Sequence, residues 1–395
     1  MILLTAFLFL ATGHSAVPKR TVEPPVRIPF ELRGDAILVS ADINGTRAVL
    51  ILDTGSGVSV LDTGFARIAG LERSGSTVNV IGTRPSSVLM SSASRVALGG
   101  VTLTDVAVAA LDFSAVQQRL GRDVVGTIGY ELFTRYVVTV DFVAGLLTLS
   151  EPEGFEYTGK GFVIPVQLAS RVPVAAAIIE TRTRGEVPAR LTLDLGSSGY
   201  VLKLSRSLVE ARGLSSDTVS ERGVLGIGVG GMVEGDLMRF PALRLGSVRI
   251  VRPSAALSQS IEGNFGRTAQ TDGTVGMNLF RRTRVIIDYA RARVILEPVD
   301  RLDVADSVDA TGITLSITGA VVPMALVSHV VSGSAAANAG VMAGDELVAV
   351  DGRPTTSIPL TARRDLFRAV GARHRLTLRR NGSLIETVIT QRELF

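Results

Sequence analysis

The sequence predicts a mainly β protein in which one structural unit occurs twice and a smaller domain of a different kind follows. Three observations support this prediction. Short apolar runs, alternating or rich in branched residues and separated by glycine-containing turns, are typical of β-strands. A series of short sequence motifs in residues 28–150 occurs again, in the same order, in residues 161–298. Residues 311–391 contain different motifs, which indicates that they form a separate domain.

The first unit is organised around the stretch from Ala48 to Leu61, with the sequence AVLILDTGSGVSVL. Apolar runs on both sides of a tight glycine turn predict strand, turn and strand, with Asp53 at a buried loop tip. The Asp-Thr-Gly triplet alone is a weak signal, because a second one begins at Asp62. That second triplet is explained more simply as the N-cap of a helix over residues 65–69.

The surroundings of Asp53 recur around Asp194, in residues 189–202 (ARLTLDLGSSGYVL), whereas Lys203 stands at the position of Asp62. In each unit the Asp turn is followed by a predicted helix, a Leu-Gly turn, a hydrophobic-Gly segment and a strand ending in Asp. The later landmarks keep the same spacing from one another in both units. They are Leu98, Gly129 and Asp141 in the first unit, and Leu245, Gly276 and Asp288 in the second. This agreement indicates that one supersecondary unit is used twice.

At these residues the sequence resembles the two-lobed, retropepsin-like aspartic proteases. In that family each lobe contributes an Asp-(Thr/Ser)-Gly turn and a hydrophobic-Gly segment that packs under it. The resemblance covers roughly residues 28–298 and implies two pseudo-twofold-related β lobes, with Asp53 and Asp194 as the catalytic pair. The residues that it implies as support for the pair are Thr54, Gly55, Ser56, Leu195, Gly196, Ser197, Ile128, Gly129, Val275 and Gly276.

The chemistry implied by the resemblance is endopeptide hydrolysis without a cofactor or a metal. Two carboxyl groups that meet across the pseudo-twofold axis cannot both ionise, so the pair titrates as a unit, as is known for aspartic proteases. The ionised member takes a proton from water, and the protonated member donates to the peptide carbonyl oxygen. The amides of Gly55 and Gly196 and the hydroxyls of Ser56 and Ser197 can bond to the carboxylates. Because such bonds lower a carboxyl pKa, we expect an acidic optimum.

The sequence departs from the family at Leu195, where Thr or Ser is usual. In the family this hydroxyl reaches the backbone of the other lobe, so Thr54 can form only one half of the link. One lost bond costs about 1 kcal/mol of stability, but a misplacement of about 1 Å can cost about 10²-fold in rate. The opposing hypothesis is therefore an inactive, exported peptide-binding scaffold. A third hypothesis is a site formed by lobes of two different chains. It is less favoured, because each lobe has its matching lobe in the same chain. We therefore expect a monomer.

Composition narrows the alternatives. The chain has no Cys, and its three His residues, His14, His329 and His374, all lie outside the two units. A Cys-His pair, a Ser-His-Asp triad and a His-ligated metal are therefore excluded there. The formal charge of +4 comes from scattered arginines, which does not favour nucleic-acid binding. The densest basic cluster, residues 281–284, is predicted to be a solvated turn or edge.

Each unit contains a hairpin that can fold over a cleft as a flap. The hairpins are predicted in Thr77–Val96 and in the glycine-rich stretch Gly223–Asp236. Ordinary surface ribbons are the alternative. The polar segment Ser150–Lys160 is interpreted as a linker between the lobes, and the acidic segment Pro298–Ala310 as the boundary before the last domain.

Residues 311–391 resemble a PDZ domain of the bacterial type, on the stretches VVSGSAAANAG from Val330 and AGDELVAVDG from Ala343. The resemblance implies binding of an extended peptide as an added strand, with backbone amides holding a terminal carboxylate. The predicted carboxylate loop begins at Thr311, and a helix over residues 361–370 is expected to flank the groove. The candidate peptide-binding residues are Gly312, Ile313, Thr314 and Leu315. A domain that only packs on the lobes is the alternative.

The N-terminal residues 1–16 are interpreted as a signal peptide. Their apolar segment, from Ile2 to Thr12, is too short for a membrane span and is followed by small residues. We therefore expect an exported, periplasmic or extracellular protein, with a short N-terminal membrane anchor as the alternative. The expected partners are protein or peptide substrates and a C-terminal peptide ligand of the last domain.

Overall fold

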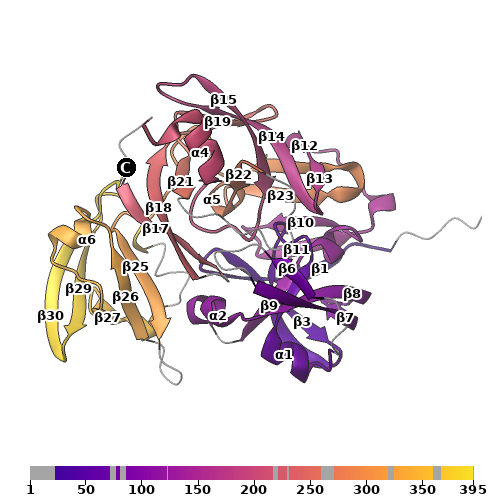
Figure 1. Cartoon of the computed structure of the whole chain (residues 1–395), viewed down its shortest axis with the longest axis horizontal. Coiled ribbons are helices and arrows are strands. Elements are labelled where there is room, and N and C mark those ends of the chain that lie inside the picture. Colours follow the sequence, from indigo (N-terminus) through magenta and orange to yellow (C-terminus); the bar gives the residue numbers. More distant parts are fainter. Residues whose placement is uncertain are drawn as a thin grey trace, which may run out of the picture.

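The computed structural model describes residues 23–71, 77–80, 86–121, 123–216, 221–228, 231–258, 271–318, 324–358 and 366–394. The expected leader, the tips of both predicted flaps and the first half of the expected helix over 361–370 lie outside the described residues. Two β lobes lie against each other, and a smaller C-terminal domain lies at one side of them (Figure 1). The predicted mainly β class is therefore confirmed.

Lobe 1 contains one mixed sheet whose central strands carry the first Asp turn. Its strands are β2 (Glu31–Arg33), β3 (Ala36–Ile43), β4 (Thr46–Leu52), β5 (Ser59–Asp62), β6 (Thr77–Val80), β7 (Ser86–Leu98), β8 (Val101–Leu111) and β9 (Val124–Ile128). Their order is β2-β3-β4-β9-β5-β8-β7-β6. The hairpin turn between β3 and β4 has positive φ at Asn44 (49°) and Gly45 (88°). β4 runs parallel to β9, with Leu52 opposite Ile128.

Lobe 2 repeats this arrangement. Its strands are β13 (Gln167–Ala169), β14 (Val172–Glu180), β15 (Glu186–Leu193), β16 (Leu202–Leu204), β17 (Glu221–Gly228), β18 (Gly231–Arg239), β19 (Ala242–Leu245), β20 (Val248–Val251), β21 (Ser254–Ser258) and β22 (Gly273–Val275). β15 runs parallel to β22, with Leu193 opposite Val275. This pairing corresponds to that of β4 with β9, so the two Asp turns begin from equivalent places.

A third sheet joins the lobes. Its strands are β1 (Val26–Pro29), β11 (Leu146–Ser150), β10 (Val137–Asp141), β23 (Thr283–Asp288), β24 (Arg293–Pro298) and β12 (Phe162–Pro165), in this order. The first three strands come from the first unit and the last three from the second. β10 and β23 pair antiparallel at the centre, with Thr139 opposite Ile286. The local twofold axis of the repeat therefore passes between these two strands.

Short helices connect the strands. They are α1 (Thr63–Ile68), α2 (Ser114–Leu120), α3 (Tyr130–Phe133), α4 (Arg206–Arg212), α5 (Met277–Phe280) and α6 (Ala335–Asn338), with 3₁₀ turns η1 (Pro152–Gly154), η2 (Leu214–Ser216), η3 (Tyr289–Arg291) and η4 (Thr355–Ser357). The predicted N-cap of α1 is confirmed, since the Asp62 carboxylate accepts the N–H groups of Gly64 and Phe65 at 2.9 and 3.0 Å. None of the described helices is long and apolar enough to cross a membrane.

One hydrophobic core extends through both lobes. It includes Leu52 and Ile128 beneath the first Asp turn and Leu193 and Val275 beneath the second, all at most 2% exposed. Burial of these branched side chains is the main favourable contribution to folding. Because the core is continuous, the positions of the two Asp turns are fixed relative to each other by close packing.

The C-terminal domain has its own core and its own sheet. Its strands are β25 (Ile313–Thr318), β26 (Met324–Val330), β27 (Glu346–Val350), β28 (Arg353–Pro354), β29 (Arg373–Arg380) and β30 (Ser383–Thr390). The domain contacts both lobes, because β26 lies beside β17 and α2 of lobe 1 lies beside β25 (Figure 1). It is therefore packed against the protease-like lobes in this structure.

The basic cluster at residues 281–284 is not the solvated turn that the sequence predicts. Arg282 is 7% exposed and Thr283 is fully buried, whereas Arg284 is exposed. The Arg281 guanidinium lies 2.8 Å from the carboxylate of Asp35, and the Arg282 guanidinium donates to the carbonyl oxygen of Val304 at 3.1 Å. These partners are distant in sequence, so the pattern of charges alone did not reveal the burial.

Candidate active site

The first Asp turn holds its carboxylate by bonds from its own loop. The Asp53 N–H donates to the carbonyl of Ile128 at 3.0 Å, which fixes the turn on β9. The Gly55 N–H donates to Asp53 Oδ1 at 2.7 Å, and the Ser56 hydroxyl donates to Oδ2 at 2.8 Å. Ser56 in turn contacts the hydroxyl of Thr127 at 3.3 Å. Both carboxylate oxygens are therefore oriented by the residues that directly follow Asp53.

The second Asp turn repeats the backbone contacts of the first and the contact between its Ser and Thr hydroxyls. The Asp194 N–H donates to the carbonyl of Val275 at 2.9 Å, and the Gly196 N–H donates to Asp194 Oδ1 at 2.9 Å. The hydroxyl of Ser197 lies 3.3 Å from that of Thr274. The two turns thus present their carboxyl groups in equivalent settings, as expected for a duplicated unit.

The two carboxyl groups meet across the local twofold axis. The side chains of Asp53 and Asp194 are neighbours, close enough for the charge of Asp194 to raise the pKa of Asp53. A Cβ atom at Gly55 would lie 2.5 Å from the Asp194 carboxylate, and a Cβ atom at Gly196 would lie 2.5 Å from the Asp53 carboxylate. Because real Cβ atoms do not approach so closely, glycine is required in both turns. The predicted pair and its two glycines therefore form one compact site.

The hydrophobic-Gly segments support the turns from below. A Cβ atom at Gly129 would lie 2.4 Å from the carbonyl oxygen of Ser56, and one at Gly276 would lie 2.5 Å from that of Ser197. The same carbonyls accept the N–H groups of the next residues in each segment, at 3.1 Å and 2.8 Å. The close approach of backbone to backbone explains why each segment needs glycine at this position.

Burial and charge favour a single proton on the pair. Burial, followed by the charge of Asp194, raises the pKa of Asp53 to about 7, and this outweighs the bonds from Ser56 and Gly55 that lower it. Two neighbouring buried carboxyl groups cannot both be ionised at low cost, so they share one proton. The sequence-based expectation of an acidic optimum rested on the bonds that lower the pKa and left out the effect of burial. With burial included, the pair is expected to keep its shared proton up to about neutral pH.

Replacing Asp53 by Asn is expected to change the pH dependence of stability. The folded pKa of Asp53, about 7, lies above its ordinary value of 3.8. The folded chain therefore keeps a proton that the unfolded chain releases, and this contribution to stability is full below about pH 4 and is lost as pH rises through about 7. Because Asn does not ionise, the stability of Asp53→Asn relative to the parent should increase over this range.

This prediction is checked by urea unfolding of both proteins from about pH 4 to about pH 7. Asp62→Asn is the matched control, since Asn is an equally good N-cap and Asp62 lies outside the pair. A constant difference between Asp53→Asn and the parent over the whole range would show that Asp53 holds no extra proton in the folded chain.

Thr54 links the two turns on its own. Its hydroxyl donates to the carbonyl of Leu193 at 2.8 Å and accepts the N–H of Leu195 at 2.9 Å. The Leu195 side chain is 1% exposed and belongs to the core of the two lobes. The unusual Leu195 therefore removes one hydroxyl from the link but leaves the half made by Thr54 intact, and its side chain adds apolar packing.

Replacing Thr54 by Val is expected to lower the free energy of unfolding by about 1–3 kcal/mol. The change keeps the shape of the side chain but leaves the buried carbonyl of Leu193 and the buried N–H of Leu195 without their partner. Urea unfolding measures the effect. Thr102→Val, on an exposed position of β8, is the control, and equal losses in both variants would show that the link contributes nothing specific.

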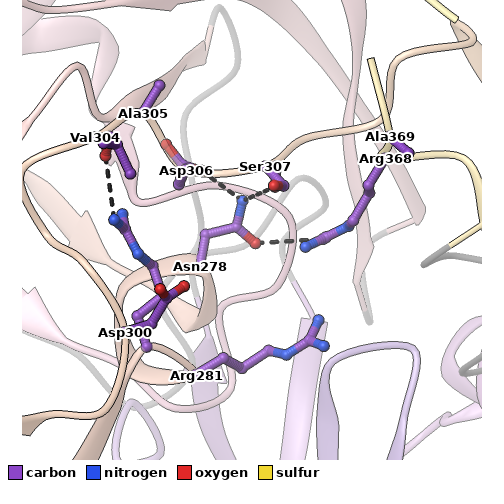
Figure 2. A pocket seen from close by; sticks show the side chains of 10 residues that line it. Asn278, Arg281, Asp300, Val304, Ala305, Asp306, Ser307, Arg368 and Ala369 are labelled. Carbon is purple, nitrogen blue, oxygen red and sulfur yellow. Dashed lines mark hydrogen bonds between the residues drawn. The ribbon is translucent and has the colours of Figure 1, made fainter. Parts of the chain in front are cut away.

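The structure also brings together residues that sequence reasoning did not single out. Asn278, on α5 directly after the second hydrophobic-Gly segment, donates to Asp306 at 2.7 Å and accepts from Arg368 of the C-terminal domain at 3.4 Å (Figure 2). Arg368 also lies 3.7 Å from the buried carboxylate of Asp35 in lobe 1, which accepts the N–H of Gly199 beside the second Asp turn at 3.3 Å. The C-terminal domain is thus connected to both lobes close to the carboxyl pair.

A cavity of about 490 Å³ lies at this junction. Its lining is mixed, polar and apolar, and comes from α5 and the turn after it, from the segment between β24 and β25, and from the C-terminal domain (Figure 2). The only sequence signal for the junction was the acidic composition of residues 298–310, which was interpreted as a boundary between domains.

The other predicted site elements are placed as follows. The predicted flaps form paired strands, β6 with β7 and β17 with β18, on either side of tips that lie outside the described residues. Their role as covers of the cleft stays a prediction. The predicted carboxylate loop lies at the start of β25, where Ile313 opens the strand.

Comparisons with known proteins support two parts of the chain separately. Residues 39–132 and 179–279, one segment in each lobe, match the family model of aspartyl proteases, and residues 326–380 match that of a PDZ domain. A search of curated proteins finds no match. Among solved structures, the chain is similar to the aspartic proteinase from Irpex lacteus, with 11% identity and a TM-score of 0.45, over 71% of this chain and 98% of that one.

Proposed function

We propose that this chain, whose two lobes are those of a retropepsin-like aspartyl protease and whose last domain is a PDZ domain, is an active endopeptidase. The observation that carries the proposal is the close approach of the two Asp turns, in which a Cβ atom at Gly55 or Gly196 would lie 2.5 Å from the opposite carboxylate, with each carboxylate held by the glycine N–H of its own turn. A pair of carboxyl groups that shares one proton contains both a base and an acid at the same place, which is what peptide hydrolysis by water requires.

In the proposed reaction, the ionised carboxylate removes a proton from a water molecule, and the water oxygen attacks the carbonyl carbon of the peptide bond. The protonated carboxyl group donates its proton to the carbonyl oxygen, so that the tetrahedral intermediate forms without a full negative charge. The carboxyl group that took the proton from water then passes it to the leaving nitrogen, and the C–N bond breaks. A hydroxyl group of the intermediate returns its proton to the other carboxylate as the product carboxyl group forms, which restores the single shared proton. The bonds from Gly55, Ser56 and Gly196 keep both carboxyl groups oriented through this cycle.

The departure at Leu195 does not favour the inactive scaffold. The hydroxyl of Thr54 still bonds to both neighbours of Asp194 along the second turn, Leu193 and Leu195. The turns are also fixed by the backbone bonds to Ile128 and Val275, which do not depend on the missing hydroxyl. The positions of the two Asp turns therefore depend on several hydrogen bonds other than the one that Leu195 lacks.

The proposal is tested by incubating the purified chain with a random peptide library from about pH 3 to about pH 7 and identifying new termini by mass spectrometry. Cleavage within the peptides, rather than from their ends, is the expected result, and the cut sites define the substrate class. Absence of cleavage at every pH would contradict the proposal and favour the peptide-binding scaffold.

We further propose that the PDZ domain binds peptides, and that the protein acts outside the cytoplasm. The first proposal rests on the PDZ match and on the peptide-binding mode of such domains. The second rests on the apolar leader in residues 1–16 alone. Detection of the processed chain in a periplasmic or culture-medium fraction is the result expected for export.

A further inference from the structure

The predicted carboxylate loop of the PDZ domain already bonds to a carboxylate of the same chain. The N–H groups of Thr311 and Gly312 donate to Asp309 Oδ1 at 2.8 and 2.7 Å, and the Thr311 hydroxyl donates to the same oxygen at 2.8 Å. The next amide, the N–H of Ile313, donates to the Thr311 hydroxyl at 3.1 Å. Three successive amides of the loop therefore have acceptors within the chain.

The loop is held rigidly in this conformation. Gly312 has a φ of +79°, and a Cβ atom there would lie 2.3 Å from the Cβ atom of Ser334. The carbonyl of Thr311, which is fully buried, accepts the N–H of Ala336, and the carbonyl of Gly312 accepts that of Val331. Successive amides fixed in such a turn form a site for an anion, and PDZ domains use such sites for a terminal carboxylate.

Asp309 is fixed in this position from both sides. The next residue, Ala310, donates its N–H to the carbonyl of Phe367 at 2.7 Å, and its own carbonyl accepts the N–H of Arg392 at 2.9 Å. Three residues earlier, Asp306 is buried in lobe 2, where it accepts the Ser254 hydroxyl at 2.6 Å. The segment around Asp309 is therefore anchored to lobe 2 and to the PDZ domain, which keeps its carboxylate at the loop.

We propose that Asp309 is an internal ligand of the carboxylate loop and thereby determines which peptides the PDZ domain accepts. While Asp309 is bound, a free C-terminal carboxylate finds no available amide at the loop, so the domain does not select peptides by a free C-terminus. Removal of the Asp309 carboxylate opens the loop to C-terminal peptides. The inference rests on peptide binding by the PDZ domain, but not on proteolysis.

The expected effect follows from competition between two carboxylates for the same amides. An internal ligand acts at an effective concentration of about millimolar or above. To bind, a free peptide must also break the three hydrogen bonds to Asp309. The Asp309 carboxylate then loses these donors in a largely enclosed setting, which costs free energy. We therefore expect removal of Asp309 to strengthen binding of free-acid peptides by at least about tenfold.

The test compares two immobilised pools of peptides with randomised last residues, one with free C-terminal carboxylates and one with C-terminal amides. Full-length chains carry Asp53→Asn so that no peptide is cleaved, and binding is measured without and with Asp309→Ala. The cleft between the lobes binds both pools alike, so the difference between acid and amide reports on the loop. Asp303→Ala, in the same segment but exposed and paired with Arg301, is the matched control.

We expect Asp309→Ala to bind the acid pool at least about tenfold more tightly than the Asp53→Asn chain does, with no change for the amide pool and no effect of Asp303→Ala. Asp309→Asn keeps an acceptor oxygen without the charge, so it should give a smaller change in the same direction, and it serves as the test if Asp309→Ala does not fold. The proposal would be overturned if the Asp53→Asn chain, with Asp309 present, already preferred the acid pool over the amide pool as strongly as the Asp309→Ala chain does. Absence of any preference in all chains would also overturn it, because the loop would then bind no carboxylate.

Discussion

Replacement of Asp53 or Asp194 by asparagine is expected to reduce kcat/KM for peptide cleavage by at least about 10⁴-fold. Asparagine keeps the size of the side chain but neither accepts nor releases the shared proton, so the base or the acid of the pair is lost. The two groups act as one unit, and the double variant should therefore be no worse than either single variant. The measurement uses a peptide that the parent cleaves, with substrate well below KM.

Asp62→Asn is the matched control, since Asp62 begins the other Asp-Thr-Gly triplet of lobe 1, where it caps α1 and accepts the N–H of Phe113 at 3.3 Å. It should cleave at the parental rate. Full activity of either single variant, Asp53→Asn or Asp194→Asn, would show that hydrolysis does not need both carboxyl groups.

Replacement of Asp306 by alanine is expected to lower the free energy of unfolding by about 3 kcal/mol. It removes the buried ion-pair partner of Arg239 and leaves the pair with Glu393, whose side chain is 41% exposed. The Asp306 side chain is 1% exposed and lies 3.1 Å from the guanidinium of Arg239, which is 5% exposed. It also accepts the N–H and the hydroxyl of Ser254 at 2.7 and 2.6 Å, and Asn278 at 2.7 Å.

Urea unfolding of the parent, Asp306→Ala and Asp303→Ala measures this effect. Asp303 forms an exposed pair with Arg301, so its loss should leave stability unchanged. Because Asn278 follows the second hydrophobic-Gly segment, Asp306→Ala should also reduce activity at temperatures where the protein is still folded. Equal stability of the two variants would contradict the central position given to Asp306.

The duplicated protease unit was predictable because its signals are local and occur twice. Each Asp turn lies between apolar runs, and a hydrophobic-Gly segment follows at a fixed place in each unit. The backbone contacts that demand glycine at Gly129 and Gly276 leave a direct mark on the sequence. Agreement between the two copies then made a weak motif specific, and the structure brings the two turns together.

The junction with the C-terminal domain was not predictable in the same way. Asp35, Arg281 and Arg368 come from three parts of the chain and form pairs whose distance in sequence carries no signal. Asp306 and Asp309 lie in the acidic segment that was interpreted as a domain boundary, because the composition of a segment does not show which carboxylates are buried. Their roles depend on tertiary contacts that only the fold reveals.

The pH dependence of kcat/KM, measured from about pH 3 to about pH 9 on a peptide that the parent cleaves, tests the shared proton most directly. The pKa of Asp53, raised to about 7, predicts that the rate falls about tenfold per pH unit above this value, as the pair loses its proton. A rate that stays level or continues to rise through about pH 9 would contradict hydrolysis by a carboxyl pair with one proton.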